Sequence, residues 1–143
     1  MFRGFLYYRY LNRAPYHIRV GRLGEIWACK LIREMGLPVL AQNYLAPHGE
    51  IDLVARDGEV LCFIEVKTRS VDQLLRPAQA VDFDKMKHIK YAANHYLKHI
   101  GNPVTPIRYD VIEVFHENLK LKKIVYRPNF QKEKETPLSF YGL

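Results

Sequence analysis

The chain has 143 residues, a length that suits one domain with one hydrophobic core. Hydrophobic residues make up 48% of it and charged residues 26%, which indicates a globular rather than a disordered chain. Charges interrupt its apolar runs well before the ~18 residues that a membrane span needs, so we expect no membrane segment. The formal net charge of +7 favours a polyanionic partner, although it would also serve solubility alone.

Two features bear on the cellular compartment. Residues 1–19 are expected to form an N-terminal extension that lacks the clean apolar core and the cleavage site of a signal peptide. Cys29 and Cys62 stand inside apolar segments without CxxC spacing, which predicts buried thiols rather than a disulfide or zinc ligands. We therefore expect a cytoplasmic protein. For the extension itself, a packed arm or a tail is favoured over a contact with phosphates or bases.

Hydrophobic periodicity predicts a folded domain over residues 20–126. Residues 20–35 are predicted to form a helix, because apolar side chains recur there at three- and four-residue spacings and Gly36 is a suitable stop. The apolar positions of this helix are Leu23, Ile26, Trp27, Leu31 and Met35. A short strand is expected to follow over residues 37–45.

A β-hairpin is predicted next, with strands over residues 49–55 and 59–68. Asp57-Gly58 is a dipeptide that suits a tight two-residue turn. The facing pairs are then Arg56 with Glu59, Asp52 with Phe63, and Glu50 with Glu65. Because side chains alternate between the two faces of a strand, one face carries Glu50, Asp52, Phe63, Glu65 and Lys67. The other face carries the expected core residues Ile51, Leu53, Val60, Ile64 and Val66.

A second helix and a second pair of strands are predicted downstream. Residues 69–77 form an expected loop, and the helix covers residues 82–100. Its apolar stripe consists of Met86, Ile89, Ala93, Tyr96, Leu97 and Ile100. Strands are expected over residues 107–115 and 119–126, and a polar tail over residues 127–143.

This order of elements is helix, three strands, helix, two strands, which predicts an α/β layer structure with a mixed β-sheet. The chain has no glycine-rich phosphate loop and no GxGxxG, so nucleotide-binding folds are not supported. Asp110 is expected to have a structural role, paired with Arg108 or lying near Lys67.

The predicted hairpin gathers carboxylates on one patch of sheet. Asp52 and Glu65 would be diagonal neighbours at about 7–8 Å between backbones, within joint reach of one ion. Glu50 opposite Glu65 would be unfavourable unless positive charge offsets the pair. Lys67 and Arg69 would do so in part, and a divalent cation more completely. Oxygen ligands alone suit Mg²⁺ or Mn²⁺ better than zinc.

An ordinary solvated face of surface charges is the alternative interpretation of this hairpin. Leu61 and Phe63 argue against it, because two apolar residues on the charged face indicate that the face is partly covered.

The spacing of these residues resembles that of a known protein family. Asp52, followed thirteen positions later by Glu65 and then by Lys67, resembles the D…ExK signature of the PD-(D/E)XK nuclease superfamily. The wider run is similar to the YraN-like family of bacterial proteins within that superfamily. The matching pieces, in chain order, are GRLGEIWACKLIREMG, QNY, GEIDLVARDG, FIEVKTRS, AV before a lysine-bearing helix, and RYDVIEV. Ile51 stands where the superfamily name has proline.

The resemblance implies a restriction-endonuclease-like fold, in which helices flank a central mixed sheet, and a site for Mg²⁺ or Mn²⁺. Asp52 and Glu65 would be metal ligands, with the Val66 carbonyl as a third. Lys67 would position or activate the attacking water. Glu25 matches the helical glutamate of several junction resolvases, and its alternative is an ordinary surface position.

Four further residues are expected to assist this site. Gln79 and Lys85 lie where related nucleases place helper polar groups. Glu50 and Arg69 follow from the shared hairpin patch and are expected to be auxiliary or nucleic-acid-binding.

The expected function is metal-assisted hydrolysis of phosphodiester bonds in nucleic acid, with DNA as the expected partner. No recognition helix or zinc finger is visible, so selectivity for structure, as in resolvases, is favoured over selectivity for sequence. One alternative is a non-catalytic nucleic-acid-binding or scaffold protein that retains the fold. Another is a protein–protein adaptor that uses the aromatic N-terminus. The sequence is compatible with a homodimer without specifying one.

Overall fold

The computed structural model describes residues 13–75, 83–130 and 138–141. Its elements in chain order are α2 (Tyr16–Glu34), β1 (Val39–Ala46), β2 (Gly49–Asp57), β3 (Val60–Ser70), the short 3₁₀ helix η1 (Val71–Leu75), α3 (Phe83–His99), β4 (Ile107–Glu117), β5 (Lys120–Arg127) and β6 (Leu138–Tyr141). The predicted order of helices and strands is confirmed. Two elements were not expected, namely η1 inside the predicted loop and β6 inside the predicted polar tail.

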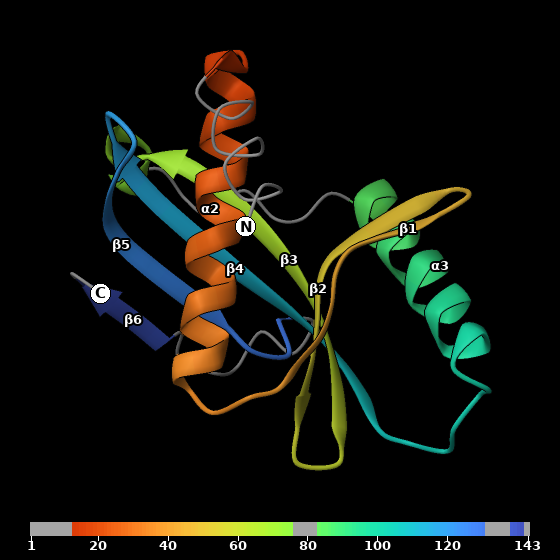
Figure 1. Ribbon diagram of the computed structural model, residues 1–143. Coiled ribbons are helices and arrows are strands. Elements are labelled where there is room, and N and C mark those ends of the chain that lie inside the picture. The colour runs from red at the N-terminus through yellow and green to blue at the C-terminus, as the bar shows by residue number, and fades with distance from the viewer. Residues whose placement is uncertain (1–12, 76–82, 131–137, 142–143) are drawn as a thin grey trace, which may run out of the picture.

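Six strands of the described chain form one mixed sheet in the order β1-β2-β3-β4-β5-β6. β3 and β4 run parallel, and every other neighbouring pair is antiparallel. α2 crosses one face of the sheet, and α3 lies beside the β1–β2 hairpin (Figure 1). The expected α/β fold with a mixed sheet is therefore confirmed. No helix in the described ranges is long and apolar enough to cross a membrane.

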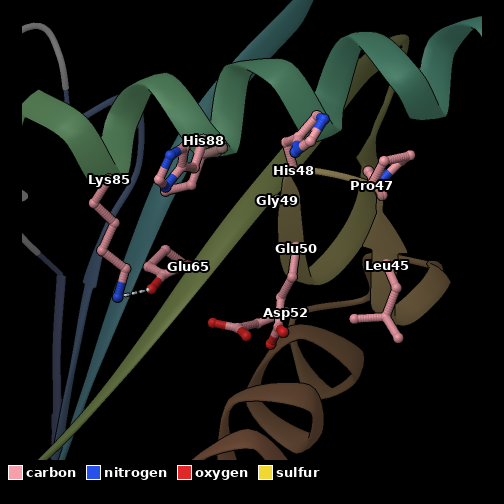
Figure 2. Close-up of a pocket in the computed structure, with 11 residues that line it drawn as sticks. Leu45, Pro47, His48, Gly49, Glu50, Asp52, Glu65, Lys85 and His88 are labelled. Atoms are coloured by element: carbon pink, nitrogen blue, oxygen red, sulfur yellow. Dashed lines mark ion pairs between the residues drawn. The ribbon is translucent and has the colours of Figure 1, made fainter.

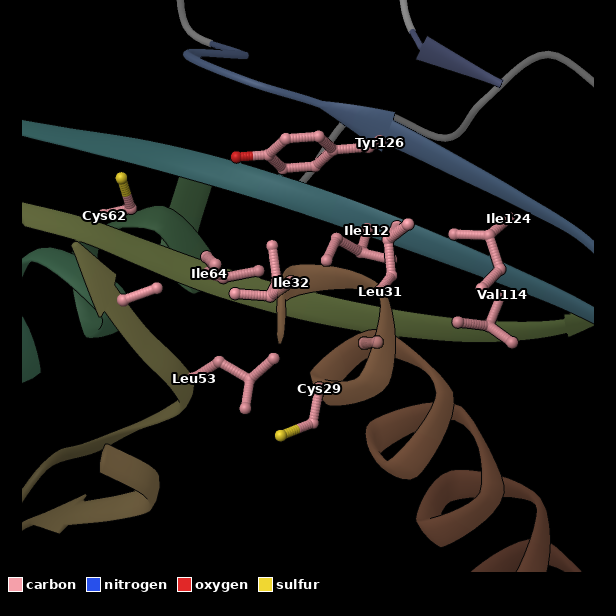
Figure 3. Close-up of a cluster of buried hydrophobic side chains, with 12 residues drawn as sticks. Cys29, Leu31, Ile32, Leu53, Cys62, Ile64, Ile112, Val114, Ile124 and Tyr126 are labelled. Atoms are coloured by element: carbon pink, nitrogen blue, oxygen red, sulfur yellow. The ribbon is translucent and has the colours of Figure 1, made fainter. Parts of the chain in front are cut away.

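The core consists of two clusters on opposite faces of the sheet. On the α2 side, Leu31 and Ile32 of the helix pack with Leu53, Ile64 and Tyr126, among others (Figure 3). On the α3 side, the cluster holds Ile51, Val54, Leu61, Phe63, Ala92, Ala93 and Tyr96. Both cysteines are free and buried, as predicted. Leu61 and Phe63 are fully covered, so the charged face of the hairpin is not the solvated surface of the alternative interpretation.

Ile51 is buried as expected, but its place in the core was predicted wrongly. It belongs to the α3-side cluster, whereas Leu53 belongs to the α2-side cluster. Pairing of β2 with β3 begins only at Leu53, opposite Ile64. Before that point β2 pairs with β1, with Ile51 opposite Tyr44, and the two strands turn toward α3 (Figure 1). Simple alternation along one flat strand therefore fails to predict the face on which Ile51 lies.

The turn of the β2–β3 hairpin is displaced by one residue from the prediction. Asp57 pairs with Val60, so Gly58 and Glu59 form the turn, and Gly58 has φ of +58°. Asp57 remains in the strand, where its Oδ2 accepts a 2.8 Å hydrogen bond from Arg108. The predicted pairs are therefore wrong. Every partner moves by two positions, and from Leu53 onward an even shift leaves the side chains on the faces that were predicted.

The buried stripe of α2 also differs from the prediction. Ile26 and Met35 are 53% and 37% exposed, whereas Gly24 and Ala28 are buried. The reason is close packing, because a Cβ on Gly24 would lie 1.7 Å from Oγ1 of Thr68 in β3. Small residues let this helix approach the sheet, and apolar periodicity alone does not reveal them. On α3, the predicted stripe ends before Ile100, which is 41% exposed past the end of the helix.

Candidate functional site

Asp52 and Glu65 meet where β2 separates from β3. They are the next residues after the first β2–β3 pair, and they are only 8% and 7% exposed. The backbone N–H of Val66 donates a 2.7 Å hydrogen bond to Oδ2 of Asp52. A side chain of β2 thus takes a backbone donor of β3, and two carboxylates are brought together at the end of the ladder.

A pocket of about 660 Å³ opens beside this pair, under α3 (Figure 2). The polar side chains that line it are those of His48, Glu50, Asp52, Glu65, Lys85 and His88. Nζ of Lys85, from the first turn of α3, lies 2.5 Å from Oε1 of Glu65. A Cβ on Gly49 would come within 2.4 Å of the His88 carbonyl oxygen, so the β1–β2 turn fits closely against α3. That contact places Glu50 at the rim of the pocket.

Burial and the neighbouring carboxylates act on the pKa of Asp52. Burial raises the pKa of Asp52, and the charges of Glu65, Glu25 and Glu50 raise it further, to about 8. The hydrogen bond from Val66 opposes this rise because it stabilises the ionised form. Carboxylates crowded in this way gain from a cation between them.

Positive charge surrounds the same carboxylates. Burial, followed by the charges of Lys85 and Arg69, lowers the pKa of Lys67, and Glu65 and Glu113 oppose that shift. Lys67 lies opposite Glu113 in the parallel β3–β4 ladder. An ammonium with a lowered pKa gives up its proton more readily, and in its charged form it attracts phosphate.

The structure divides most of the predicted site residues between two pockets, and Lys67 lines neither of them. Glu50, Asp52, Glu65 and Lys85 line the pocket under α3. Glu25, Val66 and Arg69 line a second pocket on the α2 side of the sheet. Glu25 forms a 3.1 Å ion pair with Arg22 one turn earlier. Gln79 lies outside the described residues.

Two oxygen donors and their surroundings suit a hard divalent ion. In the part of the chain that the structure describes, no three His, Cys, Asp or Glu side chains are arranged to hold a metal. Mg²⁺ is commonly held by one or two carboxylates and keeps several waters. Asp52 and Glu65 each use one oxygen in a contact within the protein and have a second. The pair therefore fits Mg²⁺ or Mn²⁺.

Sequence reasoning missed two histidines of the pocket, His48 and His88. His88 follows Lys85 by three positions on α3, so the two lie on one helix face, and that spacing was the available signal. Asp110 has the structural role that was expected. It is 1% exposed and accepts hydrogen bonds from Arg108, from Tyr126 and from the backbone of Asn129.

Comparison with known proteins shows the family. Residues 24–114 match the model of "Uncharacterised protein family UPF0102", and the chain belongs to this family. A UPF0102 protein of Koribacter versatilis is 33% identical over 118 residues, which cover 81% of this chain and 82% of the relative. One of Symbiobacterium thermophilum is 41% identical over 96 residues, 67% of this chain and 81% of the relative. One of Solibacter usitatus is 41% identical over 106 residues, 73% and 80% of the two chains. The YraN-like resemblance is confirmed at this level, since the two names denote one family.

Proposed function

We propose that the protein is a metal-dependent nuclease of the PD-(D/E)XK superfamily with a restriction-endonuclease-like fold. The observation that carries this proposal is the buried pair of Asp52 and Glu65, with Lys67 two residues further along β3. Three features support it: the D…ExK spacing, the mixed sheet between α2 and α3, and a pocket that opens on the pair.

Asp52 and Glu65 would hold Mg²⁺ or Mn²⁺, with the Val66 carbonyl as the expected third protein ligand. When bound, such an ion polarises a phosphoryl oxygen and lowers the pKa of its water. Val66 already contacts Asp52 through its N–H, which fixes the carboxylate against β3. A fixed ligand loses little freedom when an ion binds.

Lys67 and Lys85 act on the substrate in this proposal. Lys67 lies on the same strand as Glu65, and burial lowers its pKa, so it is suited to positioning or deprotonating a water beside a phosphate. Lys85 is half exposed at the rim of the pocket, where its ammonium can meet a phosphate that enters. Both groups would stabilise the negative charge that develops during phosphodiester hydrolysis.

DNA is the substrate we propose, selected by structure rather than by sequence. The net charge of +7 supplies contact with phosphates that does not depend on sequence. Within the described ranges both helices pack against the sheet, so neither is presented separately to a DNA groove. Branched or single-stranded DNA is the proposed form.

The test is a cleavage assay with Mn²⁺ on linear, single-stranded and branched DNA. Asp52→Asn is the matched control, because the amide keeps an oxygen for the Val66 N–H and loses the charge. The wild type should cut at least one substrate, and Asp52→Asn should cut none. Equal cleavage by both proteins would reject the site.

One observation favours a second candidate, a nucleic-acid-binding protein without turnover. Lys85 already neutralises Glu65 in the structure, so the carboxylate pair is stable without an ion. In that case the wild type would bind branched DNA in Mn²⁺ without cutting it, and Asp52→Asn would bind equally well.

A further inference from the structure

A second pocket, of about 530 Å³, lies between the first turns of α2 and the ends of β3 and β4. Its polar lining includes His17, Glu25, Arg69, Ser70, Gln73 and His116. Glu25 is paired with Arg22, so the lining as a whole is not acidic. The volume falls within the range of roughly 300–1,000 Å³ that small-ligand sites occupy.

The pocket exists because α2 leaves the sheet toward its N-terminus. Gly24 touches Thr68, and it is the first buried residue of the helix. One turn earlier, a Cβ on Gly21 would meet no atom within 4 Å. In Figure 1 the first turns of α2 rise past the sheet. Glycine is a poor helix former, and no packing contact in the described structure requires one at this position. Gly21 instead keeps the wall of the pocket open.

His116 presents a hydrogen-bond donor to this pocket. Its side chain is nearly buried, at 5% exposure, and its Nδ1 accepts a 3.3 Å hydrogen bond from the backbone N–H of Leu119. The neutral ring therefore carries its hydrogen on Nε2. Among the residues that the structure describes, Nε2 has no hydrogen-bond partner. Nε2 keeps some solvent exposure, so it can donate to an acceptor that enters the pocket.

Arg69 supplies the positive charge. Arg69 is one of the residues that line the pocket from β3, and its guanidinium has no ion-pair or hydrogen-bond partner in the described ranges. Ser70, the next residue, lies opposite His116 in the β3–β4 ladder, so Arg69 and His116 come from neighbouring strands. A guanidinium and an imidazole N–H together suit an anionic oxygen group such as phosphate.

We propose that this α2-side pocket binds a phosphate group, held by the guanidinium of Arg69 and by Nε2–H of His116. The phosphate belongs to a nucleic-acid strand that also reaches Asp52 and Glu65, and this second statement rests on the proposed function. Glu25 links the two places, because it lines the pocket and its charge acts on Asp52. Past Ile64, β3 is no longer paired with β2. In this proposal the nucleic-acid strand passes along that unpaired edge of β3, from one pocket to the other.

The experiment measures binding by the full chain in EDTA, so that no divalent ion takes part. The probes are inorganic phosphate and a single-stranded hexathymidylate without terminal phosphates. The readout is the set of backbone amide NMR signals of Gly21, Ser70 and Leu119, the last of which reports on the His116 ring. Gly21→Leu projects a side chain into the empty pocket and improves the helix, so it should fold. Arg69→Gln removes the guanidinium, and Lys98→Gln, on α3, is the matched loss of charge elsewhere.

We expect hexathymidylate to shift these three signals in the wild type. Its affinity should fall at least tenfold in Gly21→Leu, less in Gly21→Ala, at least fivefold in Arg69→Gln and less than twofold in Lys98→Gln. If inorganic phosphate binds as tightly as hexathymidylate, the claim that the phosphate belongs to a nucleic-acid strand is overturned, and the ligand is a free phosphate. If Gly21→Leu and Arg69→Gln bind hexathymidylate with wild-type affinity, the claim that this pocket binds the phosphate is overturned.

The two proposals fail separately. A pocket that binds hexathymidylate in a protein that cuts no DNA would reject the nuclease and keep the phosphate site. DNA cleavage with wild-type binding in Gly21→Leu would reject the phosphate site and keep the nuclease.

Discussion

Lys85 and Glu65 are joined by a 2.5 Å contact between a half-exposed ammonium of α3 and a buried carboxylate of β3. The contact occupies one of the two carboxylates that we propose as metal ligands. A cation that binds there must share Glu65 with Lys85 or displace it.

Replacement of Lys85 by glutamine should therefore strengthen metal binding. We expect the affinity for Mn²⁺ to rise by up to about fivefold, since exposed ion pairs are worth roughly 0.2–1 kcal/mol. Isothermal titration calorimetry measures the change. Lys87→Gln, an exposed lysine on the same helix, is the matched control and should leave the affinity unaltered. Weaker Mn²⁺ binding in Lys85→Gln would mean that Lys85 supports the metal site rather than competing with it.

The stability of the metal-free protein should fall between pH 5 and pH 8. The pKa of Asp52 is raised from 3.8 to about 8, so in this range the folded chain holds a proton that the unfolded chain has released. The free energy of unfolding then decreases as pH rises, by at most about 1.4 kcal/mol per pH unit for one group. Thermal unfolding in EDTA at a series of pH values checks this.

Asp52→Asn cannot titrate at this position and should lose most of that pH dependence. Mn²⁺ should stabilise the wild type most at the upper end of the range, where Asp52 is ionised. Identical pH profiles for the wild type and Asp52→Asn would show that another group is responsible.

Lys67 should be needed for cleavage but not for metal binding, because an ammonium has no lone pair to offer a cation. Lys67→Met keeps the apolar stem of the side chain. We expect cleavage to slow by about 10²–10⁴-fold, the usual contribution of a group that moves a proton, with Mn²⁺ affinity nearly unchanged. Glu65→Gln should lose both properties. Loss of Mn²⁺ binding in Lys67→Met would refute this division of roles.

Asp110 should matter for stability and not for the site. Its carboxylate is fully buried and accepts hydrogen bonds from Arg108 and Tyr126. Asp110→Ala would remove the acceptor of Nε of Arg108 and of the Tyr126 hydroxyl, and it should lower the free energy of unfolding by about 3–5 kcal/mol. Urea unfolding measures this loss, with Glu117→Ala, which removes an exposed pair with Lys122, as the control. The folded fraction of Asp110→Ala should still bind Mn²⁺ like the wild type.

The hairpin shows how far sequence patterns reach. Alternation placed Phe63 and Glu65 on the correct face even though the turn was predicted one residue too early. The error arose because Asp57-Gly58 is a good turn by local preference, whereas Arg108, 51 positions away, binds Asp57 and keeps it in the strand. Local propensity contains no information on such a distant partner. From Leu53 onward the even shift preserved the faces and changed which residues stand opposite one another.

Other features were not predictable from periodicity. The buried side of α2 is made largely of small residues such as Gly24 and Ala28, which apolar patterns overlook. β6 pairs with the edge of β5, and its four residues lie in a segment that composition marks as a polar tail. The role of His116 depends on a hydrogen bond with Leu119 across a turn, which only the folded backbone reveals.

The contact of Gly24 with Thr68 has a consequence for proton affinity. Glu25 follows Gly24 in the chain, and its charge is one of those that raise the pKa of Asp52. Any side chain at position 24 would push α2 away from β3 and carry Glu25 with it. The repulsion at Asp52 would weaken, and its carboxylate would ionise at a lower pH. The distance between α2 and β3 depends on the absence of a side chain at Gly24, and this distance in turn affects the pKa of Asp52 on β2.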